Sequence, residues 1–100
     1  MNKQIYKKFK KVVEEKLRAY PYYLISLEQN CDEDIKTIIK VIEIILDKLD
    51  KQSQVIIKEF YFSEEFDKEK LLKELNIDNN IFYRKKRKAL EKFIMGLGYL

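Results

Sequence analysis

The stretch LLKELNIDNNIFYRKKRKALEKF, residues 71–93, decides how the rest of the chain is organised. Three leucines at helical spacing and one isoleucine just beyond them predict a short helix and a tight turn with an apolar plug beneath it: Leu71, Leu72, Leu75 and Ile77. Asp78 then offers a side-chain acceptor for the free amides of a new helix. The stretch therefore predicts two helices joined by a tight turn.

The second of these helices is amphipathic and strongly basic. Its buried face is predicted from four residues with the 3.6-residue periodicity of a half-buried helix: Phe82, Ala89, Leu90 and Phe93. In a helix-turn-helix, the second helix enters the DNA major groove and its first two turns read the base edges. Asparagine bonds adenine and arginine bonds guanine in two-pronged fashion, so we expect four residues to read bases: Asn79, Asn80, Tyr83 and Arg84.

The basic run RKKRK, residues 84–88, supplies the cations for phosphate contacts, which we expect from Lys85, Arg87 and Lys88. A solvated helix face is the simpler interpretation of such a run. Five consecutive cations surround a helix, so they cannot all face one duplex; Arg84, Arg87 and Lys88 fit the outward face best. The stems of Lys85 and Lys86 are expected to lie over the core edge while their charges reach solvent or phosphate.

The spacing of this stretch resembles region four of bacterial sigma factors, which reads I-A-x-x-L-G-I-S, a polar triplet, Val, and Ala-Leu seven residues on. The first part of that pattern falls here on Leu71, Leu72, Leu75, Asn76, Ile77 and Asp78. Phe82 stands at the valine position, and Ala89-Leu90 matches directly. LDKLDKQSQVIIKEFYF, residues 46–62, looks like the helix that packs across a region-four helix-turn-helix.

The wider pattern, from LRAYPYYLISLE at residues 17–28 to GLGYL at residues 96–100, is similar to the ArpU family of small phage and prophage late-transcription regulators. Two positions depart from region four. Asn76 replaces the usual turn glycine, which is tolerable because asparagine accepts a left-handed backbone comparatively well. Lys85 replaces an apolar residue, so the middle of the second helix is expected to be thinly anchored.

These resemblances imply a sequence-specific transcriptional regulator of phage or prophage type that binds double-stranded DNA through a recognition helix over residues 79–94. They also imply action with RNA polymerase, or as a homodimer over a repeated half-site. A hundred residues leave no obvious room for the domains by which a complete sigma factor melts promoter DNA. Two alternatives stay open: a helical interaction module for an acidic protein, and a DNA-packaging component that resembles a small terminase subunit.

Composition predicts an all-α fold, a small helical bundle with the helix-turn-helix at its C-terminal end. The chain has 100 residues, 46% of them hydrophobic, which is enough for a modest core, and only two glycines and one proline. We expect residues 1–52 to form a helical segment for packing or dimerisation and residues 53–100 to form the DNA-binding segment, within one compact domain.

The remaining helices are predicted from apolar periodicity and end signals. Residues 3–20 fit an amphipathic helix that Pro21 ends, since proline disfavours a helical conformation in the residue before it. Cys31 lies in a polar turn, and the acids at residues 32–34 begin a helix over residues 33–50. That helix is apolar over more than one stripe, which suits either several neighbours or a dimer seam.

Two helix caps and an apolar tail complete the expected layout. Ser53 is expected to cap the next helix, and Asp67 to cap the first helix of the 71–93 stretch. The C-terminal residues are expected to fold back as an apolar tail: Leu97, Tyr99 and Leu100.

Residue types exclude several functions. With no histidine and one cysteine, the usual zinc ligands, a Cys–His nucleophile and an internal disulfide are all absent, so we expect no metal and no cofactor. Without these groups or a glycine-rich phosphate loop, we expect no enzyme. No apolar run approaches the roughly 18 residues that span a bilayer, and no secretion signal begins the chain. We therefore expect no membrane partner and an intracellular protein, and the resemblance to phage regulators implies a place in the bacterial host cytoplasm.

The net charge of +4 is unevenly distributed. Residues 1–20 carry seven Lys/Arg against two Asp/Glu, giving +5, and residues 79–100 carry six against one, also +5. Residues 21–52 and 53–78 each carry four against seven, giving −3. Two basic ends around an acidic middle favour a nucleic-acid partner. For the N-terminal helix we prefer a packing role, with its lysines adding only general attraction, over a basic arm on the DNA backbone.

Overall fold

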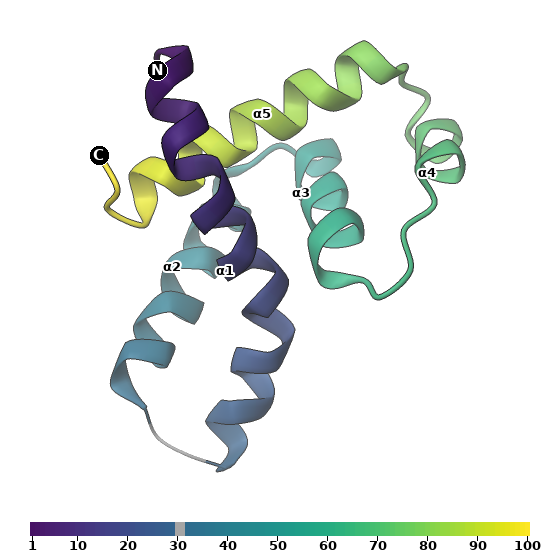
Figure 1. Cartoon of the computed structure of the whole chain (residues 1–100). Helices are drawn as coiled ribbons and strands as arrows, with labels where there is room; N and C mark the ends of the chain where they lie inside the picture. The colour runs from purple at the N-terminus through teal and green to yellow at the C-terminus, as the bar shows by residue number, and fades with distance from the viewer. Residues whose placement is uncertain (30–31) are drawn as a thin grey trace.

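The computed structural model describes residues 1–29 and 32–100, and all regular structure in that part of the chain is helical (Figure 1). The elements are α1 (Lys3–Gln29), α2 (Glu33–Lys48), α3 (Lys51–Ile57), the π-helical turn η1 (Lys58–Phe62), α4 (Lys68–Leu75) and α5 (Asn79–Gly96). The all-α fold class is confirmed for these residues. The turn expected around Cys31 lies outside them. No described helix combines the length and apolar character needed to cross a bilayer.

The first two helices form an antiparallel hairpin, and α5 lies across one end of it (Figure 1). The prediction that Pro21 ends the first helix is wrong, because α1 continues without interruption to Gln29. A proline inside a helix removes one hydrogen bond and crowds the preceding turn. Tertiary contacts offset this cost here: Tyr20 donates a hydrogen bond to Glu43 at 2.7 Å and its ring stacks on Phe62 at 4.5 Å.

A large hydrophobic cluster, the main core, fills the junction of α1, α2, α3, η1 and α5. Its buried members are Val13, Leu17, Ile42, Ile45, Leu46, Leu49, Ile57, Tyr61, Ala89, Leu90, Phe93 and Ile94. A smaller cluster, the minor core, lies beneath α4 and consists of buried Ile56, Leu71 and Phe82 with half-buried neighbours. The predicted buried face of α5 is therefore confirmed, but its residues are divided between two clusters.

Aspartates cap the N-termini of α2, α3, α4 and α5. Asp32 accepts hydrogen bonds from the backbone of Asp34 and Ile35, which confirms the predicted acidic start of α2. Asp67 caps α4 as expected. The expectation that Ser53 caps α3 is wrong: Asp50 is the cap and accepts the Ser53 amide at 3.1 Å. Ser53 lies inside the first turn, where its own amide needs an acceptor.

The C-terminal tail folds back only in part. Leu97 and Tyr99 pack on the main core, and the Tyr99 ring stacks on Phe9 of α1 at 5.5 Å. Gly98 has a φ of 85°, a left-handed conformation that suits glycine and reverses the chain. Leu100 contradicts the prediction because it is 61% exposed; the chain has already passed the edge of the core at this point.

Candidate nucleic-acid interface

The turn between α4 and α5 is closed by backbone geometry that the sequence encodes locally. Asn76 ends α4 in the left-handed conformation, with φ 54° and ψ 50°, as predicted for a residue at the glycine position. The Ile77 amide then donates to the Leu72 carbonyl at 3.1 Å, and the Ile77 side chain packs on the minor core. Asp78 accepts the Ile81 amide at 2.8 Å and so starts α5.

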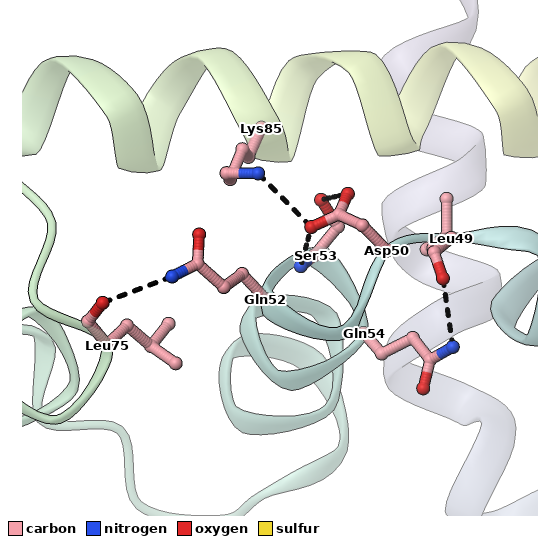
Figure 2. Close-up of polar contacts among 7 residues, drawn as sticks. All are labelled: Leu49, Asp50, Gln52, Ser53, Gln54, Leu75 and Lys85. Carbon is pink, nitrogen blue, oxygen red and sulfur yellow. Dashed lines mark hydrogen bonds and ion pairs between the residues drawn. The ribbon is translucent and has the colours of Figure 1, made fainter.

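The first turn of α3 holds both α4 and α5 through polar side chains (Figure 2). The Asp50 carboxylate accepts the Ser53 hydroxyl at 2.6 Å and forms an ion pair with the Lys85 ammonium at 3.1 Å. Two residues along, the Gln52 side-chain amide donates to the carbonyl of Leu75 at the end of α4, at 3.1 Å. One short helix therefore fixes how α4 and α5 lie relative to each other.

Hydrogen bonds also determine the ionisation of Asp50. Donation by the Ser53 hydroxyl is the largest influence and lowers the pKa of Asp50; burial opposes it, and donation by the Ser53 amide and by Lys85 adds to the lowering, which brings the pKa to about 2. The carboxylate is therefore charged at neutral pH, and it keeps the Lys85 ammonium beside α3.

The four residues expected to read bases lie on the first two turns of α5, and all of them are exposed: Asn79, Asn80, Tyr83 and Arg84. Tyr83 is 51% exposed, and its phenol accepts a hydrogen bond from the Lys68 ammonium of α4 at 3.2 Å. The edge of its ring packs against Phe82 at 5.1 Å between ring centres. Tyr83 is thus held between α4 and the minor core while about half of its surface stays exposed.

The three residues expected to bind phosphate differ in their surroundings. Lys88 is exposed, whereas Lys85 is paired with Asp50. The expectation that Arg87 faces outward is met only in part, because its side chain is 40% exposed but also packs on α1. Its guanidinium lies 4.6 Å above the Tyr6 ring of α1 and its Nε donates to Glu91 at 3.3 Å. Because α1 crosses α5 at this point, an aromatic ring is available to stack with the guanidinium.

Lys86 has a structural role that the sequence did not reveal. Its side chain is only 11% exposed, and its ammonium lies 3.9 Å from the Glu14 carboxylate and 3.9 Å above the Phe60 ring. Burial lowers the pKa of Lys86, and the attraction of Glu14 opposes that shift. The expectation that its charge reaches solvent or phosphate is therefore wrong. No local signal pairs Glu14 with a lysine 72 positions away.

A shallow hollow between α3 and α5 gathers further charge. It is lined by four cations and the capping carboxylate: Arg84, Lys85, Lys88, Lys92 and Asp50. With four positive groups around one negative group, the hollow suits an anion such as a phosphate. Across residues 1–29 and 32–100, acidic side chains nowhere gather in a group of three or more that could hold a metal ion.

Comparison with known proteins assigns no family to this geometry. No protein-family model matches the chain, and no curated protein and no solved structure matches it either. The resemblance to sigma region four and to the ArpU regulators therefore stays a prediction from the residue pattern.

Proposed function

We propose that this chain is a sequence-specific transcriptional regulator of phage or prophage type, acting on double-stranded DNA in the bacterial host cytoplasm. In this proposal α4 and α5 form a helix-turn-helix, and α5 is the recognition helix. The observation that carries it is the exposed start of α5, where Asn79, Asn80, Tyr83 and Arg84 follow directly after a tight turn. Asparagine and arginine are the side chains best suited to bonding adenine and guanine edges.

The dimensions of α5 agree with this role. An α-helix is about 10–12 Å across with its side chains, and the major groove is about 12 Å wide, so one helix fills it. The five steps from Asn79 to Arg84 rise by about 8 Å, since each residue adds about 1.5 Å. That length spans two to three base pairs at about 3.4 Å each. We therefore expect α5 to read a motif of only two to three base pairs.

Phosphate contact is supported by cations along the outer face of α5. Arg84, Lys88 and Lys92 recur every four residues, so they form one stripe, and all three are exposed. Lys85 stays beside Asp50 in the free protein. We propose that Lys88 binds phosphate directly, and that Lys85 and Arg87 contribute mainly by raising the local positive potential.

RNA polymerase and a second copy of the chain are the proposed protein partners. Action with polymerase rests on the region-four resemblance alone. Contact with a second copy has one supporting observation: a hollow between α2 and α5 is lined largely by apolar groups, and two of them, Ile44 and Met95, are 47% and 54% exposed. The same hollow supports the second candidate function, a helical interaction module.

Selection from a random duplex pool at near-physiological salt tests the proposal. We expect the purified protein to enrich a motif with a short conserved centre, and two spaced copies of the motif would identify a dimer. Retention of DNA without enrichment would reduce the interaction to phosphate attraction and would contradict sequence-specific regulation. If no duplex is retained, the interaction module becomes the better account.

A further inference from the structure

The two most basic segments of the sequence, residues 1–20 and 79–100, lie together in the fold because α1 crosses α5 (Figure 1). Tyr6 of α1 marks the crossing. Its ring lies 4.6 Å from the Arg87 guanidinium of α5 and 5.9 Å from the Lys10 ammonium of its own helix. The crossing therefore brings cations of α1 close to cations of α5.

We propose that the basic face of α1, formed by Lys3, Lys7 and Lys10, is a second phosphate-binding surface for the same DNA that α5 reads. This inference rests on the proposed function. It assigns the N-terminal helix a direct contact with the DNA backbone, beside the groove that α5 enters, in place of general attraction alone.

Helical spacing identifies the lysines concerned. Tyr6, Lys10 and Glu14 recur every four residues, and they form the stripe of α1 that meets α5, where Glu14 approaches Lys86 at 3.9 Å. Lys3 and Lys7 lie three residues before Tyr6 and Lys10, so they lie beside the same stripe, and both are exposed.

The acids next to this face are already engaged. The Glu14 carboxylate accepts the Tyr61 hydroxyl at 2.5 Å and lies 3.9 Å from both Arg18 and Lys86. Glu91 is bonded to Arg87 at 3.3 Å. Because these carboxylates are matched by other groups, the positive potential of Lys3 and Lys7 is left to act on an external anion.

Distance places this surface over the phosphates instead of the bases. Asn80 and Arg87 are seven residues apart on α5, which is about 10 Å along the helix axis. With Asn80 in a groove about 12 Å wide, Arg87 and the crossing α1 fall at the wall of the groove, where the sugar-phosphate backbone runs. Lysine suits this position because it binds phosphate as a point charge on a flexible stem.

The test compares two double variants of the full chain on a fixed duplex carrying the selected motif. Lys3→Gln with Lys7→Gln neutralises the proposed face. Lys8→Gln with Lys40→Gln is the matched control: both lysines are exposed, Lys8 lies against Phe9 and away from the Tyr6 stripe, and Lys40 lies on α2. Glutamine has a helix propensity close to that of lysine, so circular dichroism should be unchanged.

Each phosphate contact adds about 0.9 to the slope of log affinity against log salt. We therefore expect the first variant to lose about 1.8 from that slope and roughly sixty-fold in affinity at 0.1 M salt. Its sequence preference should be retained, and the control should change by less than about threefold.

Three results would overturn the inference. If both variants and the wild type share one slope and one affinity while sequence preference persists, α1 does not touch the backbone and only this inference fails. A loss of preference in the first variant would mean that α1 reads bases instead of phosphates. Absence of DNA binding by the wild type would remove the regulator proposal and this inference together.

Discussion

The two halves of α5 are held by different means. Its C-terminal half places four residues in the main core, three of them without any exposed surface: Ala89, Leu90, Phe93 and Ile94. Its N-terminal half has one fully buried side chain, Phe82, which rests on Ile56 and Leu71 of the minor core. The half that presents the candidate base-reading residues thus depends on few contacts. Stability and recognition should therefore be separable by mutation.

Charged side chains secure the middle of α5, where the region-four pattern would have an apolar residue. Lys85 pairs with Asp50 of the α3 cap, and Lys86 lies between Glu14 and the Phe60 ring. The sequence predicted a thinly anchored middle, and apolar anchoring is indeed missing from these two positions. Ion pairs and a cation–π contact take its place, which ties the orientation of α5 to α1 and α3.

The largest difference between the halves should come from truncating one phenylalanine in each. Phe93→Ala should lower the free energy of unfolding by about 3–5 kcal/mol, because the main core around it cannot easily collapse. Phe82→Ala should cost about 3 kcal/mol, at the lower end of that range, with lost amide-exchange protection confined to α4 and the first turns of α5. Urea unfolding and hydrogen exchange measure both. If Phe82→Ala instead lowers amide-exchange protection uniformly along the chain, the two halves of α5 are not held independently.

Removing the Tyr61 hydroxyl should have the next largest effect. Tyr61→Phe leaves the half-buried Glu14 carboxylate without its 2.5 Å donor, and we expect a loss of about 1–3 kcal/mol. Tyr20→Phe is the matched control, since its hydroxyl donates to the exposed Glu43 and its loss should cost about 0.5 kcal/mol. Equal losses in urea unfolding would mean that Glu14 does not depend on Tyr61.

Much of this arrangement could be predicted because local signals encode it. The left-handed Asn76, the caps at Asp67 and Asp78 and the buried face of α5 all follow from neighbouring residues. These features could therefore be predicted without knowing which helices meet in the folded chain.

The errors share a different cause. Pro21 inside α1, Arg87 against Tyr6 and Lys86 beside Glu14 depend on helices that meet only in the folded chain. Tertiary packing overrode the local preference at Pro21, covered Lys86 and drew Arg87 onto the Tyr6 ring. For the candidate site, exposure of the base-reading residues agrees with the sequence pattern, while their roles stay predictions.

The hydrogen bonds from Ser53 and the ion pair with Lys85 should make the contribution of Asp50 to stability depend on pH. The pKa of Asp50 in the folded protein is about 2, below its ordinary 3.8, so its contribution is complete above about pH 4 and is lost as the pH falls toward 2. Asp50→Asn keeps a capping residue but loses the Lys85 pair, at a cost of about 0.5–1 kcal/mol at pH 7. Urea unfolding should show that this gap narrows progressively as the pH falls from 4 to 2. If the stability difference between the wild type and Asp50→Asn does not change with pH, the charged Asp50 carboxylate does not stabilise the fold.

The smallest effect is expected from the tie between α3 and α4 (Figure 2). Gln52→Ala removes the bond to the Leu75 carbonyl and should cost about 0.5–1 kcal/mol. Gln54 lies on the same helix as Gln52 and donates to the Leu49 carbonyl, which precedes that helix. Gln54→Ala should therefore cost a similar amount. Only Gln52→Ala should lower amide-exchange protection in α4. Equal protection of α4 in both variants would show that Gln52 does not position it.

The most direct test of base reading by the N-terminal half of α5 is a comparison of Asn80→Ala with Lys88→Ala. Both are measured at fixed salt on the selected duplex and on each of its single-base variants. We expect Asn80→Ala to lose about 1–3 kcal/mol of discrimination at one base pair, and Lys88→Ala to weaken binding to all duplexes by one common factor. If Asn80→Ala also weakens binding to every duplex by the same factor, this residue does not read bases, and the central claim is contradicted.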